Sequence, residues 1–329
     1  MTNANPVESL LQLSAAYYVS RSLHAVADLG IADALGDTPQ ASAALAAATG
    51  THHGALDRVI RLLSLYGVFQ YADGVVSHSP SSRLLRQDHP QSMRSLVRMF
   101  GLPGFWSAVG ELAAAVKSGE PSADRVLPGG IWGYLAQNPD ASRVFGEAMT
   151  AKAHGAIAGI LQAYDFSGCR MIADIGGGRG HLIKAIVDGN PQVSGVLFDQ
   201  PHVVAEAAGV ASDRLRLIGG DFFRDAMPAA DTYILMEVIH DWDDEASRKI
   251  LSNIRQAARP GARLLLIELL LPDASAPNWP TTLDIVMLII GGRQRTLREY
   301  SELFRDAGFA MTRTIDTPSG IAIIEAAAM

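Results

Sequence analysis

The spacing of apolar residues divides the chain into a helical first part and a second part in which two patterns alternate. Over residues 9 to about 100, apolar positions recur mostly at helical spacing. From residue 170 onward, short apolar runs alternate with stretches of helical spacing, the pattern of a parallel, doubly wound sheet covered by helices. The runs that we expect to form its strands are Met171–Ile175, Gly195–Phe198, Leu215–Ile218, Thr232–Ile239 and Arg263–Leu269.

The end of the chain departs from this alternation. Two apolar runs, Phe309–Ile315 and Ile321–Ala326, are joined by the turn sequence Asp316-Thr-Pro-Ser-Gly320. Such a pair predicts a β-hairpin, so the last strand should be antiparallel. The predicted fold class is therefore α/β, with a Rossmann-like doubly wound sheet and an antiparallel last strand.

The first part of the chain has the pattern of a winged helix. The spacing predicts helices at Ser9–Val19, Arg21–Leu29, Ala41–Ala48 and Ala55–Leu65, and a hairpin that turns at Asp73-Gly74 follows them. A DNA-binding regulator is one interpretation, but residues 1–100 carry seven basic and seven acidic side chains. Because DNA affinity comes largely from phosphate neutralisation, this balance favours a packing or dimerisation module, whose apolar first helices pack against a second copy.

Residues 101–165 form a helical bridge between the winged-helix domain, 1–100, and the sheet domain, 166–329. Trp106 lies near its start, and Phe145 and Met149 lie on a helix that begins at Pro139. Side chains of this kind at helical spacing are usually core residues. They are also candidates for lining an apolar substrate pocket, since methionine adapts to flat ligands.

Composition limits the kind of protein and its location. The net charge of −7 argues against a nucleic-acid partner, and the single Cys169 suits a reducing compartment. No segment reaches the roughly 20 apolar residues that span a membrane. The N-terminus has no basic region typical of a secretory signal. We therefore expect a cytoplasmic protein without a membrane partner.

A glycine-rich turn follows the first predicted strand. Its pattern is Asp174-x-Gly176-x-Gly178-x-Gly180, whereas the dinucleotide fingerprint G-x-G-x-x-G places its third glycine one residue later. A leading acid suits a ligand with a cationic amino acid end and no phosphate. The stretch resembles the first motif of S-adenosylmethionine (SAM) dependent methyltransferases, although an ordinary strand-to-helix turn would have a similar composition.

The ends of the other predicted strands test this hypothesis, because ligands of open α/β sheets bind beyond the carboxyl ends of the strands. Asp199 ends the second strand, 25 residues after Asp174, where a carboxylate can accept both hydroxyls of a ribose. Asp221 and Phe222 follow the third strand and offer a carboxylate and a ring for an adenine. These residues predict one cofactor site at one edge of the sheet.

His240 follows the fourth strand and is the candidate general base. An acceptor hydroxyl must lose its proton as it attacks a methyl group, and a neutral imidazole suits that task. Glu268, at the end of the fifth strand, is placed to orient the ring and to stabilise the imidazolium. The alternative is that His240 only caps the next helix. The nearby aspartates more plausibly serve that helix dipole than a metal, so no metal is expected.

These motifs together resemble the caffeic acid/hydroxyindole O-methyltransferase family, with its many bacterial natural-product enzymes. The resemblance rests on the glycine turn, Gly220-Asp-Phe-Phe223, His240-Asp-Trp-Asp-Asp244 and Gly291-Gly-Arg-Gln-Arg-Thr296. It implies homodimerisation through the N-terminal domain. It also implies SAM contacts from Asp174, Gly176, Gly177, Gly178, Asp199, Asp221, Phe222 and Trp242, and an acceptor pocket near Phe145, Met149 and Met287.

The sequence departs from plant relatives at two positions. Gln294 replaces a second glutamate beside the histidine; it can still hydrogen-bond the ring but adds no negative charge. Met236 replaces a lysine four residues before His240. The predicted activity is methyl transfer from SAM, giving S-adenosylhomocysteine (SAH), to a hydroxyl of a small aromatic or polyketide-like acceptor. The alternatives are a decarboxylase, hydroxylase or pericyclase on the same scaffold, or a winged-helix regulator.

Overall fold

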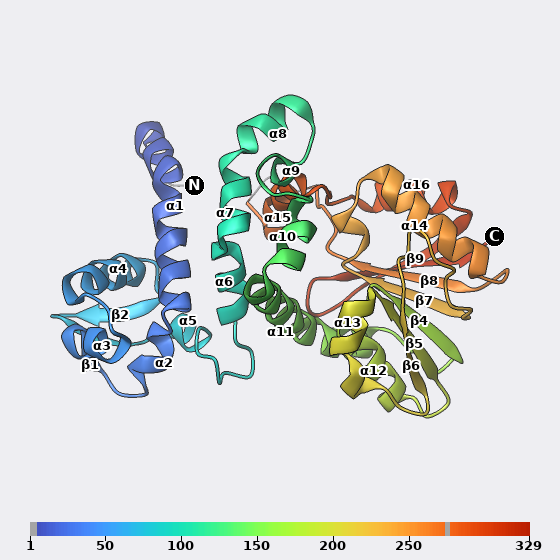
Figure 1. The fold of residues 1–329 in the computed structure, drawn as a ribbon, viewed down its shortest axis with the longest axis horizontal. Coiled ribbons are helices and arrows are strands. Elements are labelled where there is room, and N and C mark those ends of the chain that lie inside the picture. The colour runs from blue at the N-terminus through green and yellow to red at the C-terminus, as the bar shows by residue number, and fades with distance from the viewer. Residues whose placement is uncertain (1–4, 274–276) are drawn as a thin grey trace. The chain divides into compact units, whose positions relative to one another are not determined.

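The computed structural model describes residues 5–273 and 277–329. The chain divides into two compact units, one made of Met1–Trp106 with Tyr134–Lys152 and the other of Ser107–Gly133 with Ala153–Met329. Figure 1 shows the elements of both units. Among the described residues, no helix is long and apolar enough to cross a membrane.

The first unit contains the winged helix that the sequence predicts. Its elements include α1 (Pro6–Asp28), α2 (Ile31–Leu35), β1 (Gln40–Ala41), α3 (Ser42–Thr49), α4 (His53–Leu65), β2 (Phe69–Ala72), β3 (Val75–His78), α5 (Pro80–Arg83) and α6 (Arg94–Gly101). The strands form an antiparallel sheet in the order β1-β3-β2, which turns at Asp73-Gly74. Its core contains Ile31, Leu35 and Ile60, each fully buried.

The prediction of two separate helices at the start of the chain was wrong, because α1 continues without a break for 23 residues. Ser20 lies where the break was expected. Its hydroxyl donates a hydrogen bond to the carbonyl oxygen of Tyr17 at 3.1 Å, within the helix. No glycine or proline interrupts the helix after its first turn, so its hydrogen-bond ladder can continue.

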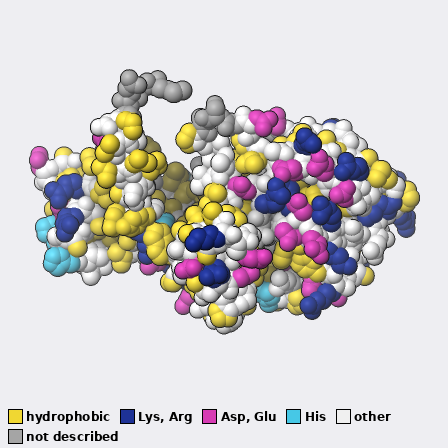
Figure 2. Space-filling view, turned by 90° about the horizontal axis from the view of Figure 1, so that it is seen from above, with side chains coloured by type: hydrophobic (Ala, Val, Ile, Leu, Met, Phe, Trp, Pro, Cys, Tyr) yellow, Lys and Arg dark blue, Asp and Glu magenta, His cyan; other side chains and the backbone are white. Residues whose placement is uncertain are grey.

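The N-terminal half of α1 exposes an unusual amount of apolar surface. Its most exposed large side chains are Val7, Leu10, Leu11, Leu13, Tyr17 and Tyr18, which are 47–74% accessible. Figure 2 shows hydrophobic side chains gathered along this helix. A contiguous apolar patch on a folded protein is typical of an interaction surface.

Five further helices follow the winged helix. They are α7 (Pro103–Gly110), α8 (Leu112–Ser118), α9 (Ser122–Val126), α10 (Gly130–Gln137) and α11 (Pro139–Ala163). Pro139 occupies the first turn of α11, where its missing N–H costs nothing. The boundary between the two compact units falls within α11, after Lys152.

The second unit is built on a seven-stranded sheet in the order β6-β5-β4-β7-β8-β10-β9. Its strands are β4 (Met171–Ile175), β5 (Ser194–Asp199), β6 (Leu215–Gly219), β7 (Thr232–Met236), β8 (Arg263–Glu268), β9 (Phe309–Asp316) and β10 (Ala322–Ala328). The first five pair in parallel, and β10 is antiparallel to both β8 and β9. The predicted fold class, with its antiparallel last strand, is confirmed.

Helices cover both faces of this sheet. The C-terminal part of α11, α12 (His181–Gly189) and α13 (Pro201–Glu206) pack on one face, and α14 (Asp244–Ala257) and α16 (Leu297–Asp306) pack on the other. Successive strand residues enter opposite layers, as Leu264 and Leu265 of β8 show. Because both faces of the central strands β4, β5, β7 and β8 are buried, these strands consist of nearly continuous apolar residues.

The fourth strand is shorter than the sequence predicts. We expected it to reach Ile239, but β7 ends at Met236 because Glu237 adopts a left-handed conformation with φ of 53°. This conformation is rare for residues other than glycine. It turns the chain out of the sheet and leads into the short loop Ile239–Trp242, called here the His240 loop.

Candidate active site

The glycine turn after β4 has a backbone that only glycine adopts readily. Gly176, Gly178 and Gly180 have φ values of 70°, 58° and 72°. A Cβ at Gly176 would lie 2.9 Å from a methyl carbon of Val238, and one at Gly177 would lie 2.5 Å from the carboxyl carbon of Asp174. Side chains are therefore excluded from the turn, and a ligand can approach its backbone.

Asp174 lies beneath this turn as a buried carboxyl group. It is 1% exposed, and neither of its oxygens has a hydrogen-bond partner among the described residues. Burial raises the pKa of Asp174 to about 7, and the negative charge of Asp199 adds to this increase. A cationic group at the turn would stabilise the carboxylate, so the site fits the ammonium end that the sequence predicts.

Asp199 connects the end of β5 to the same turn. One carboxylate oxygen accepts a hydrogen bond from the backbone N–H of Gly178 at 2.8 Å, and the other accepts one from the N–H of Gln200 at 2.7 Å. Burial raises the pKa of Asp199, and these backbone bonds oppose the increase. Asp199, the residue predicted to bind the ribose, therefore also holds the glycine turn in place.

An aromatic cluster follows at the next strand ends. The rings of Phe222 and Trp242 meet edge to face with centroids 5.7 Å apart, and Phe223 and Trp242 do so at 4.8 Å. Asp221 accepts a hydrogen bond from the N–H of Phe223 at 2.8 Å, which fixes the turn after β6. The structure thus brings together three of the predicted SAM-binding residues, namely Asp221, Phe222 and Trp242.

His240 is buried, with 4% of its surface exposed, and Glu268 at the end of β8 lies directly against it. One oxygen of Glu268 accepts hydrogen bonds from the backbone N–H groups of Ile239 and His240 at 3.0 and 3.3 Å. The other oxygen lies 3.5 Å from Nδ1 of the imidazole. Glu268 therefore holds both the loop backbone and the ring.

Gln294 is the second neighbour of the ring. Its side-chain amide lies 2.8 Å from His240 Nδ1, and its backbone N–H donates to Asp284 at 2.9 Å. The other imidazole nitrogen, Nε2, lies 3.4 Å from a carboxylate oxygen of Asp241. The three residues that we predicted to act in catalysis are thus brought together in one cluster.

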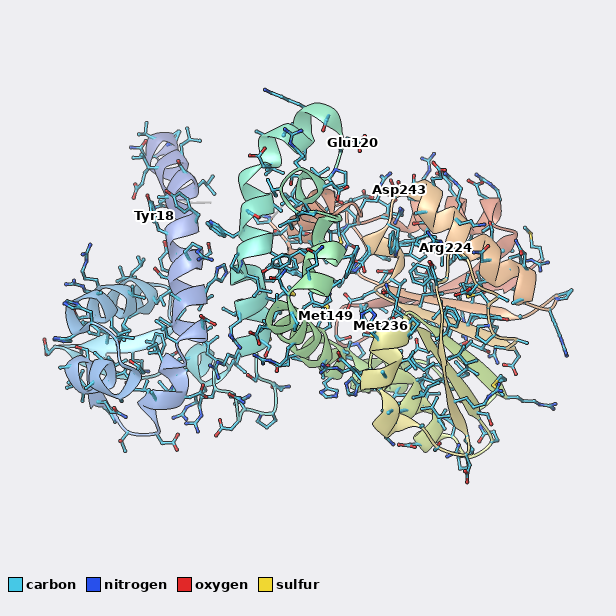
Figure 3. The ribbon with its side chains drawn as sticks, in the orientation of Figure 1. Tyr18, Glu120, Met149, Arg224, Met236 and Asp243 are labelled. Atoms are coloured by element: carbon cyan, nitrogen blue, oxygen red, sulfur yellow. The ribbon has the colours of Figure 1, made fainter. Side chains whose placement is uncertain are left out.

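Met236 and Asp243, which Figure 3 labels, precede and follow His240 in the chain. Met236 ends β7, and Asp243 caps α14 by accepting a hydrogen bond from the N–H of Ala246 at 2.8 Å. Asp244 follows in the first turn of the helix, where a negative charge is favourable. Among the described residues, no group of three or more His, Cys, Asp or Glu is arranged to hold a metal ion.

Sequence reasoning missed Arg295, a completely buried arginine beside the His240 loop. Its guanidinium donates to the carbonyl oxygens of Ile239 and Trp242 and to the carboxylate of Asp244. The residue lies within the Gly291–Thr296 stretch that carried part of the resemblance, but nothing in a linear sequence distinguishes a buried arginine from an exposed one.

The four residues predicted to line the acceptor pocket are divided between the two units. Trp106, Phe145 and Met149 belong to the first unit, where the guanidinium of Arg21 lies 4.6 Å from the Trp106 ring centroid. Met287 belongs to the second unit and lies on α15 (Trp279–Ile290), 5% exposed. Their contact with an acceptor stays a prediction.

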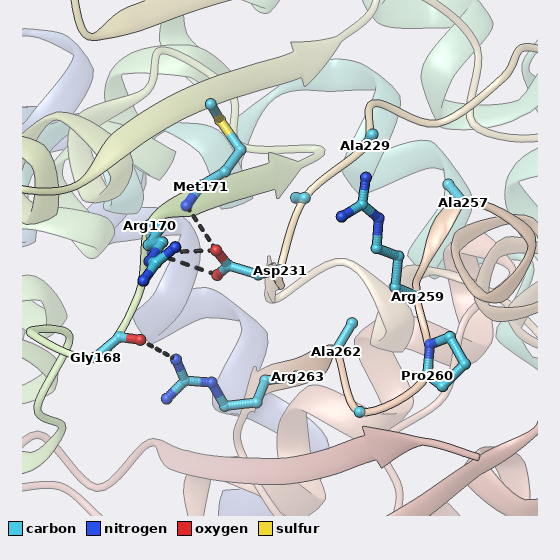
Figure 4. Close-up of a pocket in the computed structure, with 12 residues that line it drawn as sticks. Gly168, Arg170, Met171, Ala229, Asp231, Ala257, Arg259, Pro260, Ala262 and Arg263 are labelled. Carbon is cyan, nitrogen blue, oxygen red and sulfur yellow. Dashed lines mark hydrogen bonds between the residues drawn. The ribbon is translucent and has the colours of Figure 1, made fainter.

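A cavity of about 530 Å³ lies at the opposite edge of the sheet, near the amino ends of β4, β7 and β8. In it, Asp231 accepts hydrogen bonds from the backbone N–H groups of Arg170 and Met171, and Arg263 donates to the carbonyl oxygen of Gly168 (Figure 4). None of the predicted site residues lines this cavity. The candidate site is therefore at the carboxyl edge, as expected for this class of sheet.

Comparison with known families agrees with this geometry. The family model of the O-methyltransferase domain matches residues 109–310, and that of the O-methyltransferase dimerisation domain matches residues 11–88. The chain belongs to this O-methyltransferase family, and it is a SAM-dependent methyltransferase. The methyltransferase hypothesis and its cofactor are thus confirmed.

Named relatives make the relationship more specific. The chain is 40% identical to the phenazine O-methyltransferase PhzM of Lysobacter antibioticus, over 98% of this chain and 97% of that protein. It is 33% identical to the phenazine-1-carboxylate N-methyltransferase of Pseudomonas aeruginosa, over 99% of both. The SAH-bound structure of CalO1, a methyltransferase in calicheamicin biosynthesis, superposes with a TM-score of 0.86 at 30% identity, over 99% of this chain and 100% of that one.

Proposed function

We propose that this enzyme transfers the methyl group of SAM to a hydroxyl of a small aromatic or polyketide-like natural product, with His240 as general base. The observation that supports this most directly is the buried imidazole between Glu268 and Gln294. When bound, SAM supplies an electrophilic methyl group on a sulfonium. The protein has to hold SAM and acceptor in line and remove the acceptor proton.

Different residues of the site would bind different parts of SAM. The glycine turn Gly176–Gly178 offers its backbone, and Asp174 offers a carboxylate to the ammonium group. Asp199 would accept the ribose hydroxyls, and Asp221, Phe222 and Trp242 would surround the adenine. The unpaired, buried Asp174 supports this arrangement, because a bound cation would stabilise its charge.

Proton removal requires a particular form of the imidazole. His240 can accept a proton at Nε2 only if its existing proton is on Nδ1. The Gln294 amide can present either its nitrogen or its oxygen to Nδ1, because the two orientations have the same shape. We propose that the working orientation presents the oxygen, which accepts the Nδ1 proton while the charge of Glu268 stabilises the imidazolium.

N-methylation is the second candidate, and the similarity to the phenazine-1-carboxylate N-methyltransferase favours keeping it. A ring nitrogen attacks with its lone pair and needs no base, so the arrangement around His240 favours the hydroxyl. The two reactions make different demands on the same residues. An acceptor that offers both groups therefore tests the proposal directly.

The experiment uses 1-hydroxyphenazine, which carries a hydroxyl and ring nitrogens on one molecule, with SAM bearing a deuterated methyl group. We expect labelled product methylated on oxygen, identified by NMR, together with an equal amount of SAH. A phenazine without the hydroxyl is the control and should give no product. If the label is found on nitrogen with both acceptors, the hydroxyl assignment is wrong.

We also propose that two copies of the chain associate through the N-terminal domain. The match to the dimerisation domain supports this, and so does the exposed apolar surface of α1, from which Tyr18 projects (Figure 3). If a second copy covers this surface, each Å² of apolar area removed from water would stabilise the dimer by roughly 25 cal/mol.

Charging the apolar surface of α1 should therefore separate the two copies. In the variant Leu10→Glu/Leu13→Glu, two side chains that are 68% and 74% exposed become carboxylates that are costly to bury. We expect light scattering at micromolar concentration to show half the mass of the wild type. Leu65→Glu, at an 81% exposed leucine on α4, is the control and should keep the wild-type mass. A dimeric double variant would place the interface elsewhere.

A further inference from the structure

The segment Gly292–Arg295 follows α15 and contacts the His240 loop along its whole length. A Cβ at Gly292 would lie 2.1 Å from the carbonyl oxygen of His240, so only glycine fits there. The N–H of Arg293 donates to that carbonyl oxygen at 2.9 Å. The Gln294 amide contacts the imidazole, so consecutive residues of the segment hold both the backbone and the ring of His240.

Arg295 completes this contact from inside the protein. Nη1 donates to the carbonyl oxygen of Ile239 at 3.0 Å, and Nη2 donates to that of Trp242 at 2.8 Å. Nε and Nη2 both donate to one oxygen of Asp244, at 3.0 and 2.8 Å. The planar guanidinium thus joins both ends of the His240 loop to the start of α14.

The guanidinium and Glu268 hold opposite kinds of backbone group. Glu268 accepts from the N–H groups of Ile239 and His240, whereas Arg295 donates to carbonyl oxygens of the same loop. Arg295 is fully buried, and so is Glu268. Burying an arginine is costly unless its donors are paired. Here the paired groups are those that fix the loop carrying the proposed base.

We propose that Arg295 is the positioning residue that fixes His240 and Trp242 as one rigid unit, so that the base and the adenine-side ring keep their relative places. This inference rests on the proposed role of His240. It goes beyond that role because it assigns a function to the hydrogen bonds that Arg295 donates to the backbone carbonyl oxygens of Ile239 and Trp242. Arg295 acts through the backbone on either side of the imidazole. A lysine cannot replace it, because an ammonium lacks the planar fork that reaches three acceptors.

The test compares Arg295→Lys and Arg295→Met with the wild-type enzyme, counting folded sites by the stoichiometry of SAH binding in calorimetry. We expect kcat per folded site to fall about 10- to 100-fold in both variants, since small misplacements of reacting groups have effects of this size. The control is Arg248→Lys, at an exposed arginine of α14 that pairs with Asp306 at 3.2 Å, and it should keep the wild-type rate. If both Arg295 variants keep kcat within twofold while losing thermal stability, the role is purely structural and the proposal is wrong.

A second measurement covers the possibility that both variants fold poorly. The variant Arg295→Ala leaves a buried space, and millimolar methylguanidinium should restore part of its kcat, whereas methylammonium at the same concentration should not. Equal effects of the two cations, or none from either, would overturn the proposal.

The affinity for SAH distinguishes failure of this inference from failure of the proposed function. We expect the Kd for SAH to rise about fivefold in Arg295→Lys, because Trp242 loses its fixed place and an aromatic contact is worth about 1 kcal/mol. This readout needs neither an acceptor nor a base. If His240 proves not to be the base, the change in SAH affinity still tests whether Arg295 positions Trp242; an unchanged Kd would refute that part.

Discussion

Replacing His240 with alanine should lower kcat by about 10²- to 10⁴-fold while leaving the affinity for SAH close to that of the wild type. The imidazole is the group expected to accept the proton of the acceptor hydroxyl. The alanine variant loses this group but keeps the glycine turn, Asp199 and the aromatic cluster. The measurement is kcat at saturating SAM, with SAH binding followed by calorimetry.

The loss of rate in His240→Ala should also depend on the acidity of the acceptor hydroxyl. An acidic hydroxyl loses its proton to water more readily, so the loss in His240→Ala should be smaller for acidic phenols than for weakly acidic ones. A uniform loss would indicate a positional role for the ring. His89→Ala, at a histidine of the first unit, is the control and should leave the rate unchanged. A near-normal rate in His240→Ala for every acceptor would contradict the assignment of the base.

Replacing Asp174 with asparagine should stabilise the ligand-free protein at pH 8 and at the same time weaken the binding of SAM and SAH. Burial raises the pKa of this carboxyl from its usual value near 3.8 to about 7, so the folded protein binds the proton more tightly than the unfolded chain does. The resulting cost to folding is absent below about pH 4, grows as the pH rises, and is complete above about pH 7. A pKa difference of about three units between the folded and unfolded states corresponds to a destabilisation of roughly 4 kcal/mol at high pH.

The measurement is the melting temperature of wild type and Asp174→Asn at pH 5 and pH 8, with and without SAH. Without ligand, the melting temperature of the variant should exceed that of the wild type by more at pH 8 than at pH 5, because the carboxylate that the variant lacks is charged at pH 8. With SAH bound, the wild type should have the higher melting temperature, because the ammonium group of SAH pairs with the carboxylate that only the wild type has. Asp188→Asn, at an exposed aspartate of α12 that pairs with Lys184, is the control and should change neither quantity. A variant that binds SAH as tightly as the wild type would refute the ammonium site.

Most of the architecture was predictable because it depends on local spacing. The five parallel strands and the antiparallel last strand are all in the structure where the sequence places them, within a few residues. The errors have local causes that spacing does not reveal. One is the left-handed Glu237, which shortens β7, and another is the unbroken helix α1.

The candidate site was predictable as far as strand ends could locate it. Parallel strands bring their carboxyl ends to one edge, so Asp174, Asp199, His240 and Glu268 were expected at that edge. The structure places each of them within a few residues of the end of its strand, and it places Glu268 beside His240. The sequence also identified Gln294 as a neighbour of the imidazole, by resemblance. It did not determine which groups each carboxylate holds, because hydrogen bonds to backbone N–H groups depend on how the turns fold.

The sequence by itself therefore determined the class of fold, the edge of the sheet that carries the candidate SAM site and the identity of the candidate base. Only the tertiary structure decided that Asp174 is a buried, unpaired acid and that Arg295 is a buried cation. The physical reason is that burial and pairing depend on residues far away in the chain. The contacts of Arg295 with Ile239 and Trp242 span more than fifty residues, and no local pattern records them.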